Sequence, residues 1–208
     1  MRTPFLKYAL AGAVVLTLGA GGAVVAQAAL TQNPAEVRAG AYDLDSGHGK
    51  ITWSVNHLGF SKYVGQFVNV QAQLTLDPAN PSASTLTATI PLADVAPNDD
   101  RLKAHLQTAD FFDTANHPTA TFVSRSVTVD SDDPTEATVV GDLTLRGVTK
   151  PVTIEVDFNQ AGQSMGSYKA GFDGEATIKR SDFGINYALP AVSDEVELHI
   201  EGEFVLKQ

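Results

Sequence analysis

The sequence predicts an all-β fold in which eight antiparallel strands close into a barrel, with one short α-helix inserted between strands. Three observations predict this. Apolar and polar residues alternate with a period of two in most of the chain after residue 42, as in strands with one buried and one solvated face. Turn-forming stretches such as DPANP (77–81) separate the alternating runs. Only residues 98–113 break the pattern with helical spacing.

Eight alternating runs follow one another along the chain. In the first three, at 51–55, 68–76 and 86–90, apolar residues alternate with Thr, Ser, Asn and Gln. The fourth run, 119–129, changes parity between Phe122 and Val127, which predicts a β-bulge near residues 124–126. The last four runs, at 142–146, 152–158, 168–179 and 195–206, mostly set aliphatic and aromatic residues against charged residues and threonine.

The segment NDDRLKAHLQTADFFD (98–113) predicts a short helix. Leu102 and Leu106 lie four residues apart, and two aspartates at the start suit the positive end of a helix dipole. We expect the helix to run over 99–109, with Phe111 and Phe112 turning its end onto the barrel as a plug or lid.

Strand length and small residues raise the question of an internal cavity. Runs such as 64–76 span roughly 40 Å at ~3.3 Å per residue, and eight such strands close around side chains or one slender ligand. Several residues on the dry face are too small to fill a bore: Ala72, Ala88, Gly141, Ala170, Gly174, Ala176 and Gly202. Either the barrel flattens over them, or an apolar molecule occupies the space.

Composition excludes several kinds of chemistry. The formal net charge of −10 argues against nucleic acid and against an anionic membrane surface as partners. The chain has no cysteine, which rules out disulfides, thiolate catalysis, cysteine-ligated metals and acylation as a lipoprotein.

The first residues have the layout of a secretory signal. Arg2 and Lys7 precede an apolar run at 9–26, and AQA (26–28) has the small-x-small pattern that signal peptidase recognises. We expect a signal peptide over 1–28 with cleavage after Ala28, a flexible lead-in over 29–41 and the barrel domain over 42–208, which places the protein in the periplasm or outside the cell. An uncleaved anchor is the alternative.

No catalytic or metal-binding pattern stands out. The five histidines form neither an H-x-x-x-H nor an H-E-x-x-H motif, and nucleophile-elbow and phosphate-loop motifs are absent from the sequence. Arg180 and Asp182 look like an ion pair that fixes a turn. We therefore predict no enzyme activity, no metal and no cofactor. His57 and His105 stay open as contacts to a ligand head group, or as structural histidines that hold the helix.

Several motifs together resemble the YceI-like family of exported, polyisoprenoid-binding barrels. They are Tyr42, Asp45 and His48, then WSVNHLGFS (53–61), VGQF (64–67), HLQTADFFD (105–113), PTATF (118–122), GDLTLRGVTKP (141–151), RSDFGI (180–185) and DEVELHI (194–200). The resemblance covers about 41–207. It implies an extended, lipocalin-like barrel of eight strands with a short helix, which binds a long isoprenoid or similar amphiphile inside.

From these observations we expect a carrier that binds a polyisoprenoid, isoprenoid quinone or similar long-chain lipid in a barrel tunnel. The expected ligand-binding residues are Trp53, Val55, His57, Phe60, Val70, Leu74, Leu86, His105, Leu106, Phe111, Phe112, Phe122, Leu143, Leu145, Phe172, Ile178 and Phe183. Burial of each CH₂ contributes ~0.8 kcal/mol, so no directional chemistry is required.

Three alternatives remain, and the oligomeric state is a separate question. The alternation also suits an outer-membrane barrel, although the chain ends LKQ and lacks aromatic girdles, and we expect no integral membrane protein after cleavage. A structural or stress-related β protein without a ligand, and an enzyme using His57 or His105 in the tunnel, are the others. A homodimer through an exposed edge or the barrel mouth is open.

Overall fold

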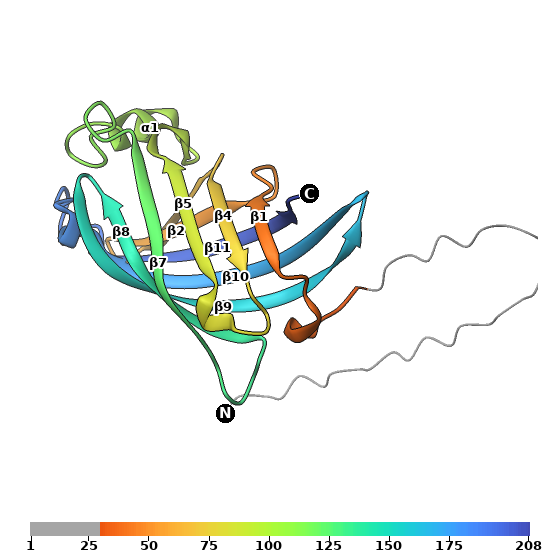
Figure 1. Ribbon diagram of the computed structural model, residues 1–208. Helices are drawn as coiled ribbons and strands as arrows, with labels where there is room; N and C mark the ends of the chain where they lie inside the picture. The colour runs from red at the N-terminus through yellow and green to blue at the C-terminus, as the bar shows by residue number, and fades with distance from the viewer. Residues whose placement is uncertain (1–29) are drawn as a thin grey trace, which may run out of the picture.

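The computed structural model describes residues 30–208, so the expected signal peptide lies outside the described residues. The described chain forms one antiparallel sheet and one short α-helix (Figure 1). The strands are β1 (Gly40–Leu44), β2 (Lys50–His57), β3 (Ser61–Phe67), β4 (Gln71–Leu76), β5 (Thr85–Pro91), β6 (Val95–Ala96), β7 (Thr119–Val129), β8 (Glu136–Leu145), β9 (Val148–Ser164), β10 (Ser167–Lys179) and β11 (Glu195–Leu206). The helix is α1 (Asp100–Leu106).

The sheet closes into a barrel because β1 pairs with both β4 and β11. The closed ring runs β1-β4-β5-β7-β8-β9-β10-β11, which confirms the predicted eight-stranded antiparallel barrel. The C-terminal part of β11 pairs with β1, where Leu206 lies opposite Tyr42, and its N-terminal part pairs with β2, where Glu197 lies opposite Ser54. β2, β3 and β6 extend the sheet from this N-terminal part of β11. β1 and β2 therefore act as one interrupted strand along β11.

The fourth run contains the irregularity that its change of parity predicts. The register between β7 and β8 shifts between Ser124 and Ser126. The shift lets Phe122 and Val127 face the same interior although they are an odd number of residues apart. The predicted bulge is thus confirmed.

Helix α1 is shorter than expected and ends at Leu106 rather than near residue 109. Asp99 caps its first turn, because its side chain accepts a hydrogen bond from the Leu102 backbone N–H at 2.9 Å. At the other end the Thr108 hydroxyl donates to the His105 carbonyl at 2.8 Å, and the Phe112 N–H donates to the Leu106 carbonyl at 3.0 Å. These turns replace the last helical turn and direct Phe111 and Phe112 inward.

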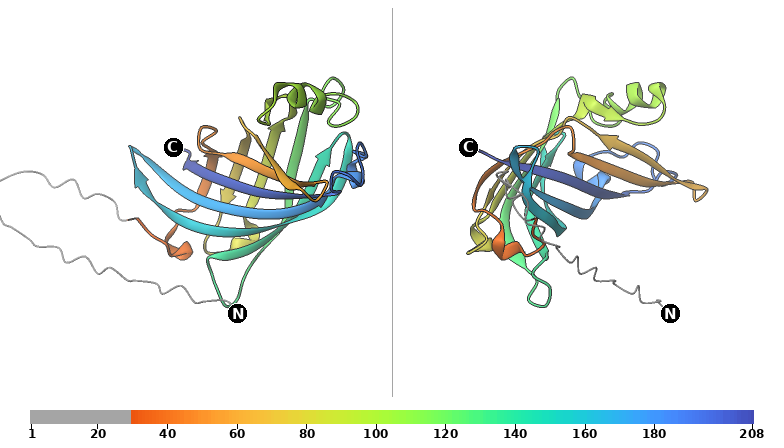
Figure 2. Two further views of the ribbon diagram at one scale, coloured as in Figure 1. Left: turned by 180° about the vertical axis from the view of Figure 1, so that it is seen from behind. Right: turned by 90° about the vertical axis from the view of Figure 1, so that its right-hand side faces the viewer.

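The two ends of the barrel are closed differently. Figures 1 and 2 show α1 and its following loop over one end, beyond β5 and β7. At the other end the lead-in packs on the barrel, and its expected flexibility stays a prediction. Thr31 bridges to Ala161, and Val37 is buried beside Tyr42 and Phe158. Val37 therefore holds the lead-in on the barrel through apolar contacts that the sequence pattern does not predict.

Tyr42 anchors the closing strand. Its side chain is fully buried, and its hydroxyl donates to the Arg38 carbonyl at 2.5 Å. Burial is the main cause that raises the pKa of Tyr42 to about 12. The lead-in is therefore tied to β1 by one buried hydrogen bond as well as by apolar packing.

Candidate functional site

The barrel contains a first chamber of about 360 Å³ at the end nearest the lead-in. Its wall is built from the inward side chains of the long strands, including Leu74 of β4, Phe122 of β7 and Phe172 of β10. Pro34 and Val37 of the lead-in close its floor. The surface that these side chains present is mostly apolar, although Lys50, Asp77, Asp173 and Glu201 also line the chamber, so it offers mainly burial.

A second chamber of about 410 Å³ lies at the end covered by α1. Trp53 and Val55 of β2, Leu106 of α1 and the two phenylalanines after α1 form much of its wall. The Trp53 ring lies so close to β3 that a Cβ added at Gly65 would come within 2.2 Å of its Cζ2 atom. A glycine at position 65 is therefore what lets the indole lie flat on the sheet.

The two chambers share part of their walls. Four side chains line both: Ile51, Ile90, Leu143 and Leu198. They come from β2, β5, β8 and β11. A chain that reached past these four aliphatic groups would have both chambers available to it.

The small inward residues account for part of the first chamber. Its wall includes Ala72, Ala88, Gly174, Ala176 and Gly202. Ala170 instead belongs to a packed cluster and is fully buried. Gly141 is covered as well, because an added Cβ would lie 2.4 Å from Cζ of the Phe122 ring. Some small inward residues are thus covered by neighbouring side chains, and others leave open space in the same barrel.

The structure places most of the expected ligand-binding residues on the chamber walls. In the first chamber are Val70, Leu74, Leu86, Phe122, Leu143 and Phe172; in the second are Trp53, Val55, His57, His105, Leu106, Phe111, Phe112, Leu143, Leu145 and Ile178. Their contact with a ligand stays a prediction.

Two expected residues line neither chamber. Phe60 is 89% exposed at the turn between β2 and β3, where the strand alternation has ended. Phe183 is 2% exposed and packs in a buried cluster with Leu92 and Ile185, two residues that themselves line the second chamber. It belongs to the 3₁₀ turn Arg180–Phe183, so period-two spacing does not apply to it. The structure therefore places both residues outside the two chambers.

Sequence reasoning omitted several wall residues. Ile154, Phe158 and Phe204 line the first chamber, and the alternation of β9 and β11 already puts them on the dry side. Tyr63 and Tyr187 line the second chamber. Tyr187 lies in an irregular loop after β10, and no periodic signal could have identified it.

The polar groups of the second chamber gather near its outer end. His105 lies 2.9 Å from Asp110 through Nε2 and has ring neighbours in Phe111 at 5.0 Å and Tyr187 at 4.9 Å. His57 bridges to Val192 through its backbone. His57 and Tyr187 are exposed and also line the chamber, so they mark its mouth.

Arg180 builds the loop beside this mouth. Its guanidinium donates four hydrogen bonds of 2.8–3.1 Å to the carbonyls of Ile185, Tyr187, Val192 and Ser193. It is 5% exposed, and burial lowers its pKa.

The acid that accompanies Arg180 is Asp194, not Asp182 as the motif suggested. Asp194 accepts from the Ser181 N–H and hydroxyl at 2.8 and 2.7 Å, and the Ser181 hydroxyl is the main cause that lowers its pKa. The sequence spacing between Arg180 and Asp182 therefore identified a real turn but the wrong carboxylate.

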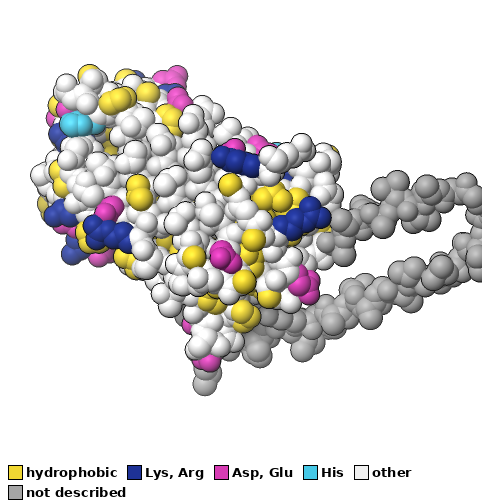
Figure 3. All heavy atoms as spheres, viewed as in Figure 1, with side chains coloured by type: hydrophobic (Ala, Val, Ile, Leu, Met, Phe, Trp, Pro, Cys, Tyr) yellow, Lys and Arg dark blue, Asp and Glu magenta, His cyan; other side chains and the backbone are white. Residues whose placement is uncertain are grey.

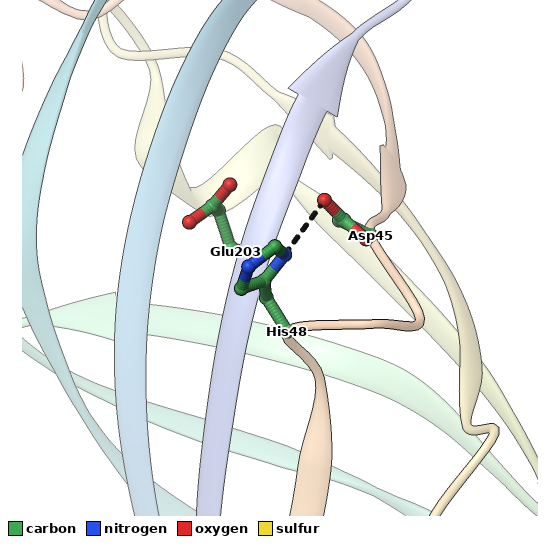
Figure 4. A group of neighbouring side chains, drawn as sticks. All are labelled: Asp45, His48 and Glu203. Carbon is green, nitrogen blue, oxygen red and sulfur yellow. Dashed lines mark hydrogen bonds and ion pairs between the residues drawn. The ribbon is translucent and has the colours of Figure 1, made fainter. Parts of the chain in front are cut away.

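One cluster of possible metal ligands lies outside the chambers. Asp45, His48 and Glu203 bring one ligand atom each within 4.8 Å of one another (Figure 4). His48 Nδ1 is 2.9 Å from Asp45, while the ammonium of Lys169 pairs with Glu203 and lies 3.9 Å from Asp45. Because the Lys169 ammonium already pairs with Glu203 and lies near Asp45, the cluster is best described as an ion-pair network.

Neither the helices of residues 30–208 nor the face drawn in Figure 3 adds a further candidate site. None of these helices has the length and apolar character needed to cross a bilayer. On the face drawn in Figure 3, charged side chains of both signs are scattered among uncharged atoms, and a group of hydrophobic side chains lies beside the start of the described chain.

Comparison with known proteins identifies the family. The model of the YceI-like domain matches residues 42–204, nearly the whole described barrel. The chain belongs to the YceI-like family. A UPF0312 protein of Pseudomonas paraeruginosa is 40% identical over 162 residues, covering 77% of this chain and 83% of the relative. Protein YceI of Escherichia coli is 40% identical over 164 residues, covering 78% and 84%.

Solved structures of the YceI-like fold agree with the barrel. BcnA of Burkholderia cenocepacia is 27% identical with a TM-score of 0.70, over 77% of this chain and 98% of BcnA. A polyisoprenoid binding domain from Saccharophagus degradans has a TM-score of 0.60 over 82% of this chain and 100% of that domain. At 13% identity the second likeness concerns the fold alone.

Proposed function

We propose that this YceI-like protein binds one long-chain apolar ligand, a polyisoprenoid, isoprenoid quinone or similar amphiphile, along the axis of its barrel. The observation that carries the proposal is the pair of apolar chambers that share Ile51, Ile90, Leu143 and Leu198. Each chamber falls within the roughly 300–1,000 Å³ of ordinary ligand pockets. Two such spaces end to end suit a long, narrow molecule better than a compact one.

The distribution of polar groups orients the ligand. The wall of the first chamber is mostly apolar, although Lys50, Asp77, Asp173 and Glu201 also contribute to it. In the second chamber His57, His105 and Tyr187 lie at the outer end, where the chamber reaches solvent. The mostly apolar surface of the first chamber suits a hydrocarbon tail, and a head group would find donors and solvent at the mouth of the second. We therefore place the tail in the first chamber and the head in the second.

The driving force is burial of hydrocarbon. Each CH₂ that leaves water contributes ~0.8 kcal/mol, so several isoprene units stabilise the complex without any specific bond. His105 lies 2.9 Å from Asp110 and beside two aromatic rings, and we propose that it contacts the head group of the ligand. The resemblance in fold to a domain named for polyisoprenoid binding supports the same class of ligand.

Location and partners belong to the same proposal. The arrangement of residues 1–28 favours export, so we propose that the protein carries its ligand in the periplasm or outside the cell. No cofactor is needed for carriage, and the proposed partner is the lipid itself.

The test is to purify the exported protein without added lipid, extract it with organic solvent and analyse the extract by mass spectrometry. We expect a long-chain isoprenoid or related amphiphile near one molecule per protein chain. Delipidated protein should then take up a polyprenol and a quinone of similar length. A protein that never yields a stoichiometric lipid and takes up neither compound would refute the proposal.

A further inference from the structure

The turn between β2 and β3 exposes two large apolar side chains. Leu58 is 54% exposed and Phe60 is 89% exposed, and together we call them the apolar tip. Figure 2 shows this hairpin projecting from the body of the barrel. Neither side chain lines a chamber, so neither the core nor the proposed ligand site explains them.

The backbone holds the apolar tip in this exposed position. The Phe60 N–H donates to the His57 carbonyl at 3.0 Å, and Leu58 and Gly59 have φ of +57° and +75°, the left-handed conformation of tight hairpin turns. The Leu58 N–H donates to the Ala191 carbonyl at 2.7 Å. The backbone of the turn is therefore fixed to the loop that Arg180 organises.

The apolar tip stands beside the mouth of the second chamber. His57 immediately precedes Leu58, lines that chamber and is exposed, and it bridges to Val192, another wall residue. Tyr187, 47% exposed, lies on the same loop. Whatever the tip contacts is thus next to the entrance through which a lipid would pass.

Charge limits what the tip can contact. Residues 57–61 contain no Asp, Glu, Lys or Arg, and the adjacent Lys62 forms an ion pair with Glu197. The whole chain has a net charge of −10, which disfavours an anionic surface. Two exposed apolar groups without a net charge suit the interface of an uncharged or zwitterionic bilayer, where such side chains are removed from water.

We propose that the apolar tip inserts Leu58 and Phe60 into the surface of a zwitterionic lipid bilayer and so holds the mouth of the second chamber against the source of its ligand. This inference rests on the proposed lipid binding. Two side chains make only a weak and reversible anchor, which suits a protein that must leave with its ligand.

The first experiment measures docking independently of ligand binding. Full-length exported protein is sedimented with phosphatidylcholine vesicles, and the double variant Leu58→Asn, Phe60→Ser is compared with it. Asparagine tolerates the left-handed conformation of position 58, so the variant should fold. We expect its vesicle partition coefficient to fall at least about tenfold, a difference of ~1.4 kcal/mol.

The control is Met165→Ser. Met165 is 97% exposed at the turn between β9 and β10, with φ of +48°, but no residue of that turn lines a chamber. We expect its partition coefficient to equal that of the unchanged protein. Equal binding by the double variant, or no vesicle binding by the unchanged protein, would overturn the proposal. So would self-association through the hairpin, seen as a dimer in light scattering that the double variant abolishes.

The second experiment separates docking from carriage. A fluorescent polyprenol is offered either in phosphatidylcholine vesicles or in detergent micelles. We expect the double variant to load at least about tenfold more slowly from vesicles and at the unchanged rate from micelles. Equal slowing from both sources would overturn the docking proposal. Vesicle binding through the tip with no uptake of polyprenol from either source would support docking and refute the proposed function.

Discussion

At the scale of single residues, Arg180 shows how one buried charge organises the chamber mouth. Its guanidinium satisfies four carbonyls of residues 185–193, a stretch with little regular structure. A planar fork with several fixed donors can do this, and a lysine ammonium cannot match the geometry. The position of Tyr187 in the second chamber depends on this loop, so a structural residue shapes the candidate site.

The first prediction concerns Arg180→Leu. Removal of the guanidinium leaves several carbonyls without donors, so we expect the free energy of unfolding to fall by about 3–5 kcal/mol. Arg180→Lys should recover only part of this loss. Urea unfolding followed by circular dichroism measures both variants. A loss below ~1 kcal/mol for the leucine variant would contradict this role.

The second prediction is a dependence on pH from Asp194. Hydrogen bonds from Ser181, followed by its proximity to Arg180, hold its folded pKa below the ordinary value of 3.8. The carboxylate therefore contributes stability that is complete above pH 3.8 and is lost as the pH falls through the lowered folded pKa. Unfolding at a series of pH values should show a smaller acid-induced loss in Asp194→Asn than in the unchanged protein. Equal losses would refute this.

At the scale of elements, the strand pattern was readable from the sequence and the loops were not. Alternation fixes which side chains face inward, so Leu74, Phe122 and Phe172 were placed on the chamber wall correctly. Even the bulge near Ser124 follows from parity. Phe60 and Phe183 lie outside both chambers because each belongs to a turn, where no period relates a residue to a face. Tyr187 was missed for the same reason.

The lead-in shows another limit of sequence reasoning. Residues 31–40 have no periodicity, yet Val37 packs against Tyr42 and Phe158 and the segment closes the first chamber. The contacts join residues far apart in sequence, so no local sequence pattern predicts them.

The predicted helix ends three residues early for another reason. The Thr108 hydroxyl donates to the His105 carbonyl and so competes with the backbone N–H that would continue the helix.

The third prediction tests the start of α1, which covers the second chamber. Asp99→Ala removes the side-chain acceptor of the Leu102 N–H, and we expect a loss of about 1 kcal/mol in the free energy of unfolding. Asp100→Ala is the matched control, because Asp100 lies within the helix and its side chain does not cap. Chemical denaturation of both variants gives the comparison. Equal effects would mean that the cap has no special role.

At the scale of the whole molecule, the barrel combines a packed part with an open part. Fully buried Leu92 and Val95 and the cluster around Phe183 fix the shape, while Ala72, Ala88 and Ala176 leave room along the bore. A well-packed protein without a ligand has little reason to keep two adjoining apolar spaces. The architecture is therefore consistent with an interior made to be occupied.

The fourth prediction fills that interior. Ala176 lines the first chamber, so Ala176→Phe should weaken binding of a long isoprenoid at least about tenfold, because its tail no longer fits. Thr177→Phe adds a phenyl ring to the next residue of β10, which is exposed and outside both chambers. It should bind as the unchanged protein does. Equal affinities for the two variants would show that the tail does not occupy the first chamber.

Trp53 allows the central claim to be measured directly. It is the single tryptophan of the chain and lines the second chamber. A long-chain isoprenoid quinone is titrated into delipidated protein while tryptophan fluorescence is recorded. Occupation of the barrel predicts saturable quenching that ends at one quinone per chain and weakens in Ala176→Phe but not in Thr177→Phe. Fluorescence that stays unchanged, or that falls linearly without saturation, would contradict an interior that holds the ligand.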